Sequence, residues 1–240
     1  MINELKINLS PSKNELKTIK KWLFEESRNT DEGFYYNWYI IEKAFEEMEL
    51  FTLNINDNAI GFAVWHKSGY FADIDIFEIN LENRKKGIGN YFYNEIEQVF
   101  KNHDIKAIKL FCSPRVSEFF WRKMGFIKFP NIAHNETDLN FYKPLVEVKV
   151  STHNPNEYNK LELWDIDFCQ GNTKKPLLSW NIESEPEKFN KPIIQPCNMD
   201  WWLRWTKNGK IVKEHIVKRF SNSDNRIEFS PFMYIEKLIE

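Results

Sequence analysis

The stretch Arg84-Lys-Lys-Gly-Ile-Gly89 stands where a strand pattern ends and an amphipathic helix pattern begins. Before it, residues 71–79 (Phe-Ala-Asp-Ile-Asp-Ile-Phe-Glu-Ile) alternate and are rich in β-branched side chains, which is typical of a strand. After it, apolar residues recur at helical spacing: Ile88, Phe92, Ile96 and Phe100. A glycine-containing turn between a strand and a helix presents backbone N–H groups at the positive end of the helix dipole, which is an arrangement that binds phosphates.

The residue types in this stretch suit an anion. Gly87 and Gly89 lack the side chains that would block a close approach, and Arg84, Lys85 and Lys86 add positive charge at the rim. The Gly-Lys-Ser/Thr ending of a nucleotide P-loop is missing, and so is the three-glycine turn of dinucleotide-binding proteins. From the residues alone, the sequence predicts an anion site of neither of these two kinds.

The composition is that of a soluble globular protein with room for one large domain or two modest ones: 240 residues, 42% hydrophobic and 28% charged. A net charge of −2 argues against nucleic acid and anionic lipid as partners. No apolar run approaches the roughly 18 residues of a membrane helix, and Met1–Lys6 is too polar for a signal peptide. Cys112, Cys169 and Cys197 are far apart and show no ligand spacing with histidines, so we expect reduced thiols, no metal and a cytoplasmic location.

The flanking residues predict alternating helices and strands. Ser12-Lys-Asn-Glu15 has the form of a capping box, which marks the start of a helix, and Asn56-Asp-Asn58 is typical of a hairpin turn. In the first 145 residues we expect strands at 5–9, 50–55, 59–65, 70–79, 107–112, 126–129 and 139–145. We expect helices at 12–28, 34–48, 88–100 and 116–124.

This order of elements resembles that of the GNAT superfamily, the acetyl-CoA-dependent N-acetyltransferases, over about residues 3–145. Two motifs carry the resemblance. Ile79-Asn-Leu-Glu-Asn-Arg-Lys-Lys-Gly-Ile-Gly89 resembles the family's strand-to-helix segment, and Phe119-Phe-Trp-Arg-Lys-Met-Gly-Phe126 resembles its aromatic-rich helix that ends in Gly-Phe. The resemblance implies an α/β (α+β) fold with a mixed, mostly antiparallel central sheet and helices on both faces.

The resemblance also implies a site for acetyl-CoA as co-substrate. The strand before the loop would splay from its parallel neighbour, and its backbone would pair with the pantetheine arm. The pyrophosphate would bind N–H groups of the loop, and a backbone N–H near Ile79 would polarise the thioester carbonyl. The cofactor-binding residues expected on this basis are Ile79, Asn80, Leu81, Arg84, Lys85, Lys86, Gly87, Ile88, Gly89, Asn90 and Trp121.

Acetyl transfer to an amine needs a base, because an ammonium must lose a proton before it attacks. The strand offers three candidates: Asp73, Asp75 and Glu78. Asp73 and Asp75 are two residues apart and should point to one face at roughly 7 Å, where burial would raise the pKa of a carboxyl toward a useful value. Either Asp73 or Asp75 is the first choice, and Glu78, beside the expected bulge, is the second.

Two positions depart from the family pattern. Trp121 stands where many members have a tyrosine, and an indole N–H cannot act as a proton donor near neutral pH. The leaving thiolate would then be protonated by water or by another tyrosine, such as Tyr70, Tyr91 or Tyr93. Pro114 replaces the family's asparagine near the cofactor arm, so the contacts after Cys112 stay open.

An acceptor pocket is expected where the first two helices meet the hairpin, judging from the fold. Aromatic residues at the start of the second helix, Tyr35, Tyr36, Trp38 and Tyr39, could stack on an apolar or cationic substrate, or belong to the core. The acceptor would be a primary amine on a small molecule or a protein. The alternative is a non-catalytic CoA-binding or scaffold protein whose C-terminal domain binds a partner.

After Leu145 the pattern changes, and we place the boundary between a domain of residues 1–148 and a tryptophan-rich antiparallel β domain of residues 149–240. This second domain resembles no family that we can name. Strands are expected at 161–168, 176–182, 201–206 and 211–220, with Asn208-Gly209 as a hairpin turn and 232–239 as a closing strand or helix. Trp201, Trp202 and Trp205 cannot all point one way in a strand, so we expect at least one to be exposed. The hypothesis is that this domain shapes the acceptor site or forms a homodimer.

Overall fold

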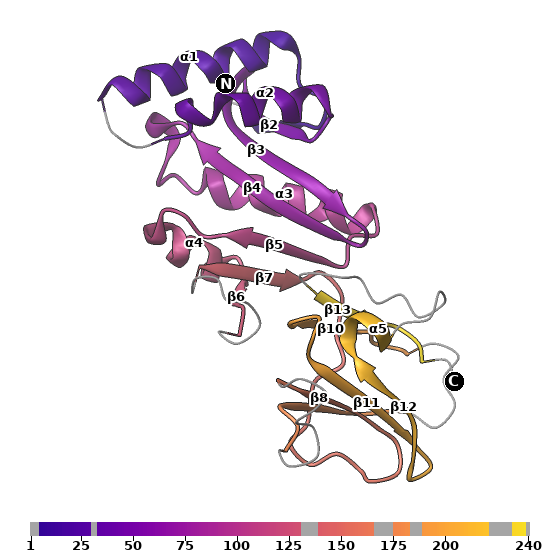
Figure 1. Cartoon of the computed structure of the whole chain (residues 1–240). Helices are drawn as coiled ribbons and strands as arrows, with labels where there is room; N and C mark the ends of the chain where they lie inside the picture. The colour runs from indigo at the N-terminus through magenta and orange to yellow at the C-terminus, as the bar shows by residue number, and fades with distance from the viewer. Residues whose placement is uncertain are drawn as a thin grey trace. The chain divides into compact units, whose positions relative to one another are not determined.

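The computed structural model describes residues 5–29, 33–130, 139–165, 175–182, 189–220 and 232–238 (Figure 1). The chain divides into two compact units, Met1–Phe126 and Ile127–Glu240. The boundary predicted from sequence, after residue 148, stays a prediction, because a compact unit is not by itself an independently folding domain.

The first unit is a mixed sheet in the strand order β1-β2-β3-β4-β5. Every neighbouring pair is antiparallel except β4 and β5, which are parallel. The strands are β1 (Leu5–Asn8), β2 (Leu50–Ile55), β3 (Asn58–Ser68), β4 (Phe71–Ile79) and β5 (Ala107–Phe111). The helices are α1 (Lys13–Asn29), α2 (Trp38–Glu46), α3 (Ile88–Asn102) and α4 (Glu118–Lys123), with 3₁₀ turns η1 (Tyr35–Asn37), η2 (Leu81–Asn83) and η3 (Arg115–Ser117).

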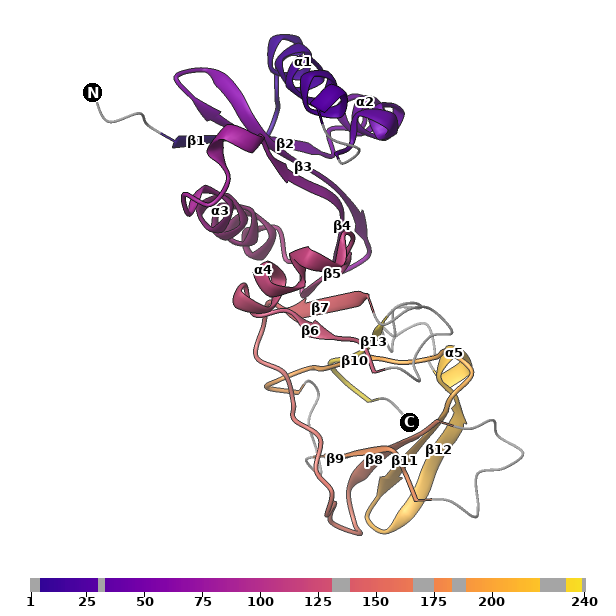
Figure 2. The same cartoon turned by 90° about the vertical axis from the view of Figure 1, so that its left-hand side faces the viewer.

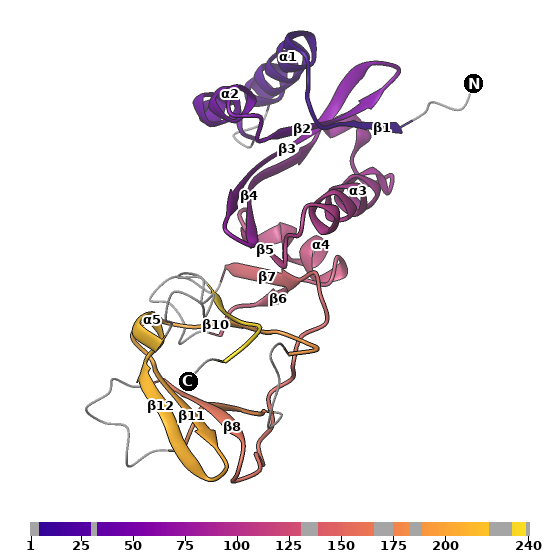
Figure 3. The same cartoon turned by 90° about the vertical axis from the view of Figure 1, so that its right-hand side faces the viewer.

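Helices cover both faces of this sheet: α1 and α2 lie on one face, and α3 and α4 on the other (Figures 2 and 3). On the first face, Ile19 and Leu23 of α1 pack with Phe62 of β3 and Ile76 of β4 in one buried cluster. On the other face, the ring centroid of Phe100 in α3 lies 4.8 Å from that of Trp65. The predicted fold class is confirmed: the central sheet is mixed and mostly antiparallel, with helices on both faces.

The start of α1 is fixed by the predicted capping box. The backbone N–H of Ser12 donates to Glu15 Oε2 (2.6 Å), and the N–H of Glu15 bonds to Ser12 Oγ (3.3 Å). Glu15 also accepts hydrogen bonds from Asn54 Nδ2 (2.6 Å) and Thr52 Oγ1 (2.7 Å) of β2, so one carboxylate both caps the helix and ties it to the sheet. Burial alone would raise the pKa of Glu15, but these hydrogen bonds outweigh it and lower the pKa to about 2.

Replacing Glu15 by Gln should therefore lower the free energy of unfolding by about 2–3 kcal/mol at pH 7, because an amide group would face donors that need an acceptor. The pKa of Glu15 is lowered by folding, so the stabilisation is present above pH 4.5 and is lost as the pH falls toward 2. Urea unfolding at pH 7 and pH 2 measures it. Glu25→Gln, which removes an exposed carboxylate of the same helix, should change stability by less than about 0.5 kcal/mol. Equal effects of the two variants would contradict this account.

The second unit contains small antiparallel sheets. β6 (Ile127–Lys128) pairs with β7 (Asn140–Pro144), and β10 (Ile193–Pro196) pairs with β13 (Phe232–Ile235). A four-stranded sheet has the order β12-β11-β8-β9. Its strands are β8 (Lys160–Trp164), β9 (Leu178–Asn181), β11 (Trp202–Lys207) and β12 (Lys210–Ile216). The Asn208-Gly209 hairpin is confirmed, and residues 232–235 form a strand. Residues 166–168 of the first predicted strand lie outside the described residues.

Two predictions for this unit are wrong. Residues Val217–Phe220 form a short helix, α5, rather than the end of a strand. All three neighbouring tryptophans are buried, with exposed fractions of 6% for Trp201, 2% for Trp202 and 5% for Trp205. Trp201 and Trp205 pack into one cluster, whereas Trp202 packs with Trp164 in another. Side chains pointing in different directions are therefore buried in separate clusters. Across the described part of the chain, no helix is long and apolar enough to cross a membrane.

Candidate functional site

A cleft opens in the first unit where β4 and β5 part. Their parallel pairing runs from Phe71↔Ala107 to Ile74↔Leu110, and β4 then continues to Ile79. The cleft has a volume of about 760 Å³ and is lined by residues of α1, β4, the glycine loop, α3, β5 and the η3–α4 segment. Its size is that of a pocket for a cofactor or small ligand. The splayed strand pair implied by the family resemblance is therefore present.

An irregularity in β4 decides which side chains face the cleft. Val64 of β3 pairs with Ile76 and Trp65 pairs with Ile74, so Asp75 is an extra residue opposite no partner, which is the pattern of a β-bulge. Beyond it, Phe77, Glu78 and Ile79 all line the cleft. On the neighbouring strand, a Cβ at Gly61 would lie 2.5 Å from Ile79 Cδ1 and 2.9 Å from the carbonyl oxygen of Glu78, so only glycine lets the two backbones approach this closely.

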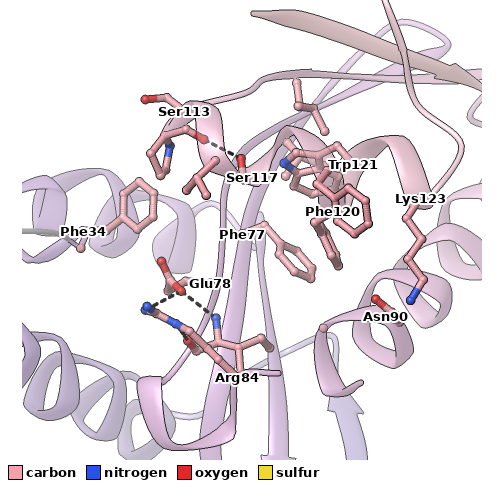
Figure 4. A pocket seen from close by; sticks show the side chains of 18 of the residues that line it. Phe34, Phe77, Glu78, Arg84, Asn90, Ser113, Ser117, Phe120, Trp121 and Lys123 are labelled. Carbon is pink, nitrogen blue, oxygen red and sulfur yellow. Dashed lines mark hydrogen bonds and ion pairs between the residues drawn. The ribbon is translucent and has the colours of Figure 1, made fainter. Parts of the chain in front are cut away.

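Glu78 and Arg84 meet at one end of the cleft, below Phe34 (Figure 4). Arg84 Nη2 lies 2.9 Å from Glu78 Oε1, and the same carboxylate oxygen accepts a hydrogen bond from the N–H of Ile79 (3.0 Å). Arg84 Nη2 also donates to Glu26 Oε1 of α1 (2.5 Å), and its Nε donates to the carbonyl oxygen of Ile79 (2.7 Å). One guanidinium thus binds two carboxylates and the backbone of β4.

The surroundings of Glu78 give its carboxyl a pKa of about 7. Burial raises the pKa, the positive charge of Arg84 lowers it, and the negative charge of Glu26 raises it again. A carboxyl with this pKa is half ionised at neutral pH, so it can both accept and return a proton. Glu78 therefore has the properties of a general base, and it lies in the cleft.

The opposite end of the cleft carries the glycine loop and the N-terminus of α3. Lys85 and Gly87 have positive φ angles of 61° and 79°, and Gly87 stands at the N-cap of α3. The first N–H groups of an α-helix have no partner within the helix, and here they open onto the cleft. Lys123 of α4 and Asn90 of α3 lie beside each other at this end (Figure 4). The stretch predicted to bind an anion thus places a left-handed glycine, a helix N-terminus and Lys85 at the cleft, and anion binding there stays a prediction.

Aromatic rings separate the two ends. Phe77 stacks on Phe120 (ring centroids 5.6 Å apart) and on Phe92 (5.3 Å), and it meets Trp121 edge-on (5.4 Å). Trp121 also packs edge-on against Tyr93, at 5.8 Å. These rings form an apolar wall, in which Trp121 packs against its aromatic neighbours.

Among the residues that the structure describes, none that lines the cleft is a tyrosine. Tyr93 is buried, which moves its pKa well above the usual range, and Tyr91 donates its hydroxyl to the carbonyl oxygen of Leu5 (3.3 Å). The hydroxyls at the cleft belong to Ser113 and Ser117, on the segment after β5 (Figure 4). Ser117 Oγ donates to the carbonyl oxygen of Pro114 (2.9 Å). Sequence reasoning did not select either serine.

The structure brings together nine of the predicted site residues in the cleft: Asp75, Glu78, Ile79, Arg84, Lys85, Gly87, Gly89, Asn90 and Trp121. The others do not line it: Asp73, Asn80, Leu81, Lys86, Ile88, Tyr35, Tyr36 and Trp38. The N–H of Asn80 already bonds to the carbonyl oxygen of Ile60 (2.8 Å). Leu81 begins η2. The catalytic, cofactor-binding and substrate-binding roles expected for the residues of both groups stay predictions.

Asp73 and Asp75 share a partner, as expected for carboxylates on one face. His66 Nδ1 lies 3.0 Å from Asp75 Oδ2, and its Nε2 lies 3.4 Å from Asp73 Oδ2. Burial lowers the pKa of His66, but the hydrogen bond and charge of Asp75 outweigh it and raise the pKa above its usual value. Asp73 is also 3.7 Å from Lys109. Glu78 also faces a basic residue, Arg84, so position distinguishes the three carboxylates. Burial raises the pKa of Asp73, but Asp73 does not line the cleft, and Asp75 lines it with its carboxylate bonded to His66.

Sequence reasoning missed most of the aromatic wall of the cleft and two charged residues. Phe34, Phe77, Phe120 and Lys123 line the cleft, as does Glu26. A signal for Glu26 existed: it continues the apolar stripe Leu16, Ile19 and Leu23 at helical spacing. A carboxylate in the buried stripe of a helix needs a partner, and that partner is Arg84.

Comparisons with known proteins agree with this geometry. Residues 13–126 match the family model described as "Acetyltransferase (GNAT) family". The match covers most of the first unit, whereas residues 127–240 lie outside it. A comparison with curated proteins finds no significant match.

Solved structures that resemble the chain are GNAT acetyltransferases. One is PaiA N-acetyltransferase from Thermoplasma acidophilum in complex with coenzyme A, with 19% identity, a TM-score of 0.48, and coverage of 59% of this chain and 99% of that chain. Another is N-acetylglutamate synthase from Neisseria gonorrhoeae complexed with coenzyme A and N-acetyl-glutamate, with 12% identity, a TM-score of 0.45, and coverage of 60% and 36%. A third is the ribosomal-protein-S18-alanine N-acetyltransferase from Escherichia coli, with 12% identity, a TM-score of 0.42, and coverage of 59% and 94%.

Proposed function

We propose that the first unit is an N-acetyltransferase that moves an acetyl group from acetyl-CoA to a primary amine by direct attack in a ternary complex. The observation that carries the proposal is the arrangement of one cleft. A carboxyl with a pKa of about 7 stands at one end, and a helix N-terminus that begins at a left-handed glycine stands at the other. The match of residues 13–126 to the acetyltransferase family supports the same activity.

Each end of the cleft has a separate role in this proposal. The N–H groups at Gly87–Asn90, together with Lys85 and Lys123, would bind the pyrophosphate of acetyl-CoA. The apolar wall around Phe77 and Trp121 would exclude water from the arm that connects the phosphates to the thioester. Glu78 would face the acceptor amine at the far end, where the thioester is brought to it.

In the reaction, the neutral amine nitrogen forms a bond to the acetyl carbon, and the bond from that carbon to sulfur breaks. Glu78 takes the proton that the ammonium loses before attack. The departing thiolate takes a proton from solvent, because the cleft residues in the described part of the chain include no tyrosine to supply it. The nitrogen loses its second proton to solvent as the amide forms, and Glu78 returns its own proton to solvent. The products are a free thiol, an N-acetylated amine and one net proton, so the protons and charges balance.

The finer assignments are proposals as well. A small amine is preferred over a protein as acceptor, because Phe34 lies above Glu78 and Arg84 in the cleft, where an aromatic ring could stack on an apolar or cationic group. The location is proposed to be cytoplasmic, in line with the widely spaced cysteines. Residues 149–240 are proposed to shape the acceptor site or to form a homodimer. Deletion of these residues with unchanged kinetics and oligomeric state would exclude that role.

The second candidate function is a non-catalytic CoA-binding protein or scaffold. One contact favours it: the N–H of Ile79, which the family resemblance assigns to the thioester carbonyl, already donates to Glu78 Oε1 at 3.0 Å. If this contact persists with the ligand bound, then Glu78 is not free to act as a base. The N-acetyltransferase is preferred because a shift of one side chain would release both groups.

The test is an acetyl-transfer assay with acetyl-CoA labelled in the acetyl group and a panel of primary amines: diamines, amino acids, arylalkylamines and aminoglycosides. Mass spectrometry should find an acetylated amine in amounts equal to the CoA thiol released. Binding of acetyl-CoA without transfer to any amine in the panel or to lysine-containing peptides would favour the non-catalytic function.

A further inference from the structure

Arg84 belongs to the phosphate loop in sequence, but its side chain leaves the loop and enters the acceptor end of the cleft (Figure 4). Its Nη2 contacts Glu78 Oε1 and Glu26 Oε1, at 2.9 and 2.5 Å, and its Nε bonds to the carbonyl oxygen of Ile79. The guanidinium is therefore fixed from three sides. Two of these contacts come from β4, and the third comes from α1.

Glu26 is the contact from α1, and it is the residue of this group that sequence reasoning did not select. Its side chain is only 5% exposed, and it lies at the cleft together with Gly33 and Phe34. It does not reach Glu78 by an ion pair, since both are acidic. Its effect on Glu78 must therefore pass through Arg84 and through its own negative charge.

We propose that Glu26 is a positioning residue for the acetyl transfer: it holds the Arg84 guanidinium against β4 and divides the positive charge of Arg84 between two carboxylates, so that Glu78 stays available as a base. This inference rests on the proposed function, and it goes beyond it by assigning a role to a helix α1 residue outside β4 and the loop.

The physical reason is a competition for one cation. An arginine that pairs with a single carboxylate stabilises its charged form and makes it a poor base at neutral pH. A second buried carboxylate on the same guanidinium opposes this effect, because two negative charges lie close together. The pKa of Glu78 follows this balance, since burial and Glu26 raise it and Arg84 lowers it. The other charged side chains that line the cleft are Asp75, Lys85 and Lys123.

The test is direct titration of the Glu78 carboxyl by ¹³C NMR, with protein labelled at the glutamate side-chain carboxyl carbons. Glu78→Gln assigns the resonance by removing it. In the wild type it should titrate near pH 7. In Glu26→Gln, which keeps the side chain's shape and removes its charge, the pKa of Glu78 should fall by about one unit. Glu25→Gln, on the exposed side of the same helix, should leave the pKa within about 0.2 units.

A pKa of Glu78 that is unchanged in Glu26→Gln, or that rises, overturns the proposal. If Glu26→Gln does not fold, the wild-type spectra still test the coupling between the two carboxyl groups. The Glu26 carboxyl resonance should shift at the pH where Glu78 titrates. A Glu26 resonance that ignores that titration also overturns the proposal. None of these readouts requires a substrate, so absence of acetyl transfer would count against the proposed function and not against this coupling. With an active amine, the acidic limb of kcat/KM should move to lower pH by the same amount.

Discussion

Replacing Glu78 by Gln should lower kcat for acetyl transfer by about 10²- to 10⁴-fold at pH 7, which is the usual contribution of a general base. Gln is close to Glu in shape and can still accept from the N–H of Ile79, but it cannot take a proton. Acetyl-CoA affinity should change little, because the phosphates would bind at the other end of the cleft. Steady-state rates and a binding titration on the same preparation separate the two effects.

The direction in which kcat/KM changes with pH follows from the pKa of Glu78. Glu78 acts as a base only when ionised, and its pKa is about 7. In the wild type, kcat/KM should rise about tenfold per pH unit below pH 6 and level off above pH 8. This limb should vanish in Glu78→Gln.

Asp75→Asn provides the matched control, because Asp75 also lines the cleft but faces His66. We expect it to lower kcat by less than about tenfold. A Glu78→Gln enzyme with wild-type kcat, or an Asp75→Asn enzyme with the larger loss, would show that the base has been assigned to the wrong carboxylate.

Replacing Arg84 by Ala should destabilise the protein by about 3 kcal/mol and should raise the pKa of Glu78 above 7. The guanidinium is the cation for two carboxylates with side chains that are 5% and 16% exposed, and removing one partner of a buried ion pair leaves an uncompensated charge. Since Arg84 lowers the pKa of Glu78, its loss favours the protonated form, and the acidic limb of kcat/KM should move to higher pH. Urea unfolding and the pH–rate profile measure the two effects.

Arg84→Lys is the informative control. Lysine keeps the charge, so the pKa of Glu78 should stay closer to 7, but a single ammonium cannot reproduce the planar contacts to both carboxylates and to the Ile79 carbonyl. Part of the stability should therefore be lost while the pH profile is largely kept. If instead Arg84→Ala weakens acetyl-CoA binding strongly without moving the pH profile, Arg84 acts at the phosphates, as the sequence had suggested.

Features of the fold and of the site that depend on residues close together in the chain could be predicted from the sequence. The capping box at Ser12 and Glu15 was found because its two partners are three residues apart. The glycine loop was found because a strand pattern, two glycines and a helix pattern follow one another directly, and the structure gives Gly87 the positive φ that a glycine permits.

Features that depend on distant residues could not be predicted. Arg84 was assigned to the phosphates because it begins the stretch that resembles the family's pyrophosphate loop, but its partner Glu26 is 58 residues away in the chain. The alternation rule for β4 could not locate the bulge at Asp75, since the bulge depends on the register with β3. In the same way, burial of all three tryptophans depends on what packs against each of them, and a single strand does not reveal this.

The most direct test of the account is calorimetric titration of acetyl-CoA into the wild type and into Gly87→Glu and Gly87→Asn. Gly87 has a φ of 79°, and nothing lies within 4 Å of a Cβ placed there, so a side chain would project into open space. Asn tolerates this backbone conformation and adds no charge, whereas Glu places a negative charge where phosphates would bind. We expect one-to-one binding to the wild type, a modest loss in Gly87→Asn and a loss of at least about 100-fold, or 2.7 kcal/mol, in Gly87→Glu. No binding to the wild type, or equal affinity of wild type and Gly87→Glu, would contradict the assignment of this cleft to acetyl-CoA.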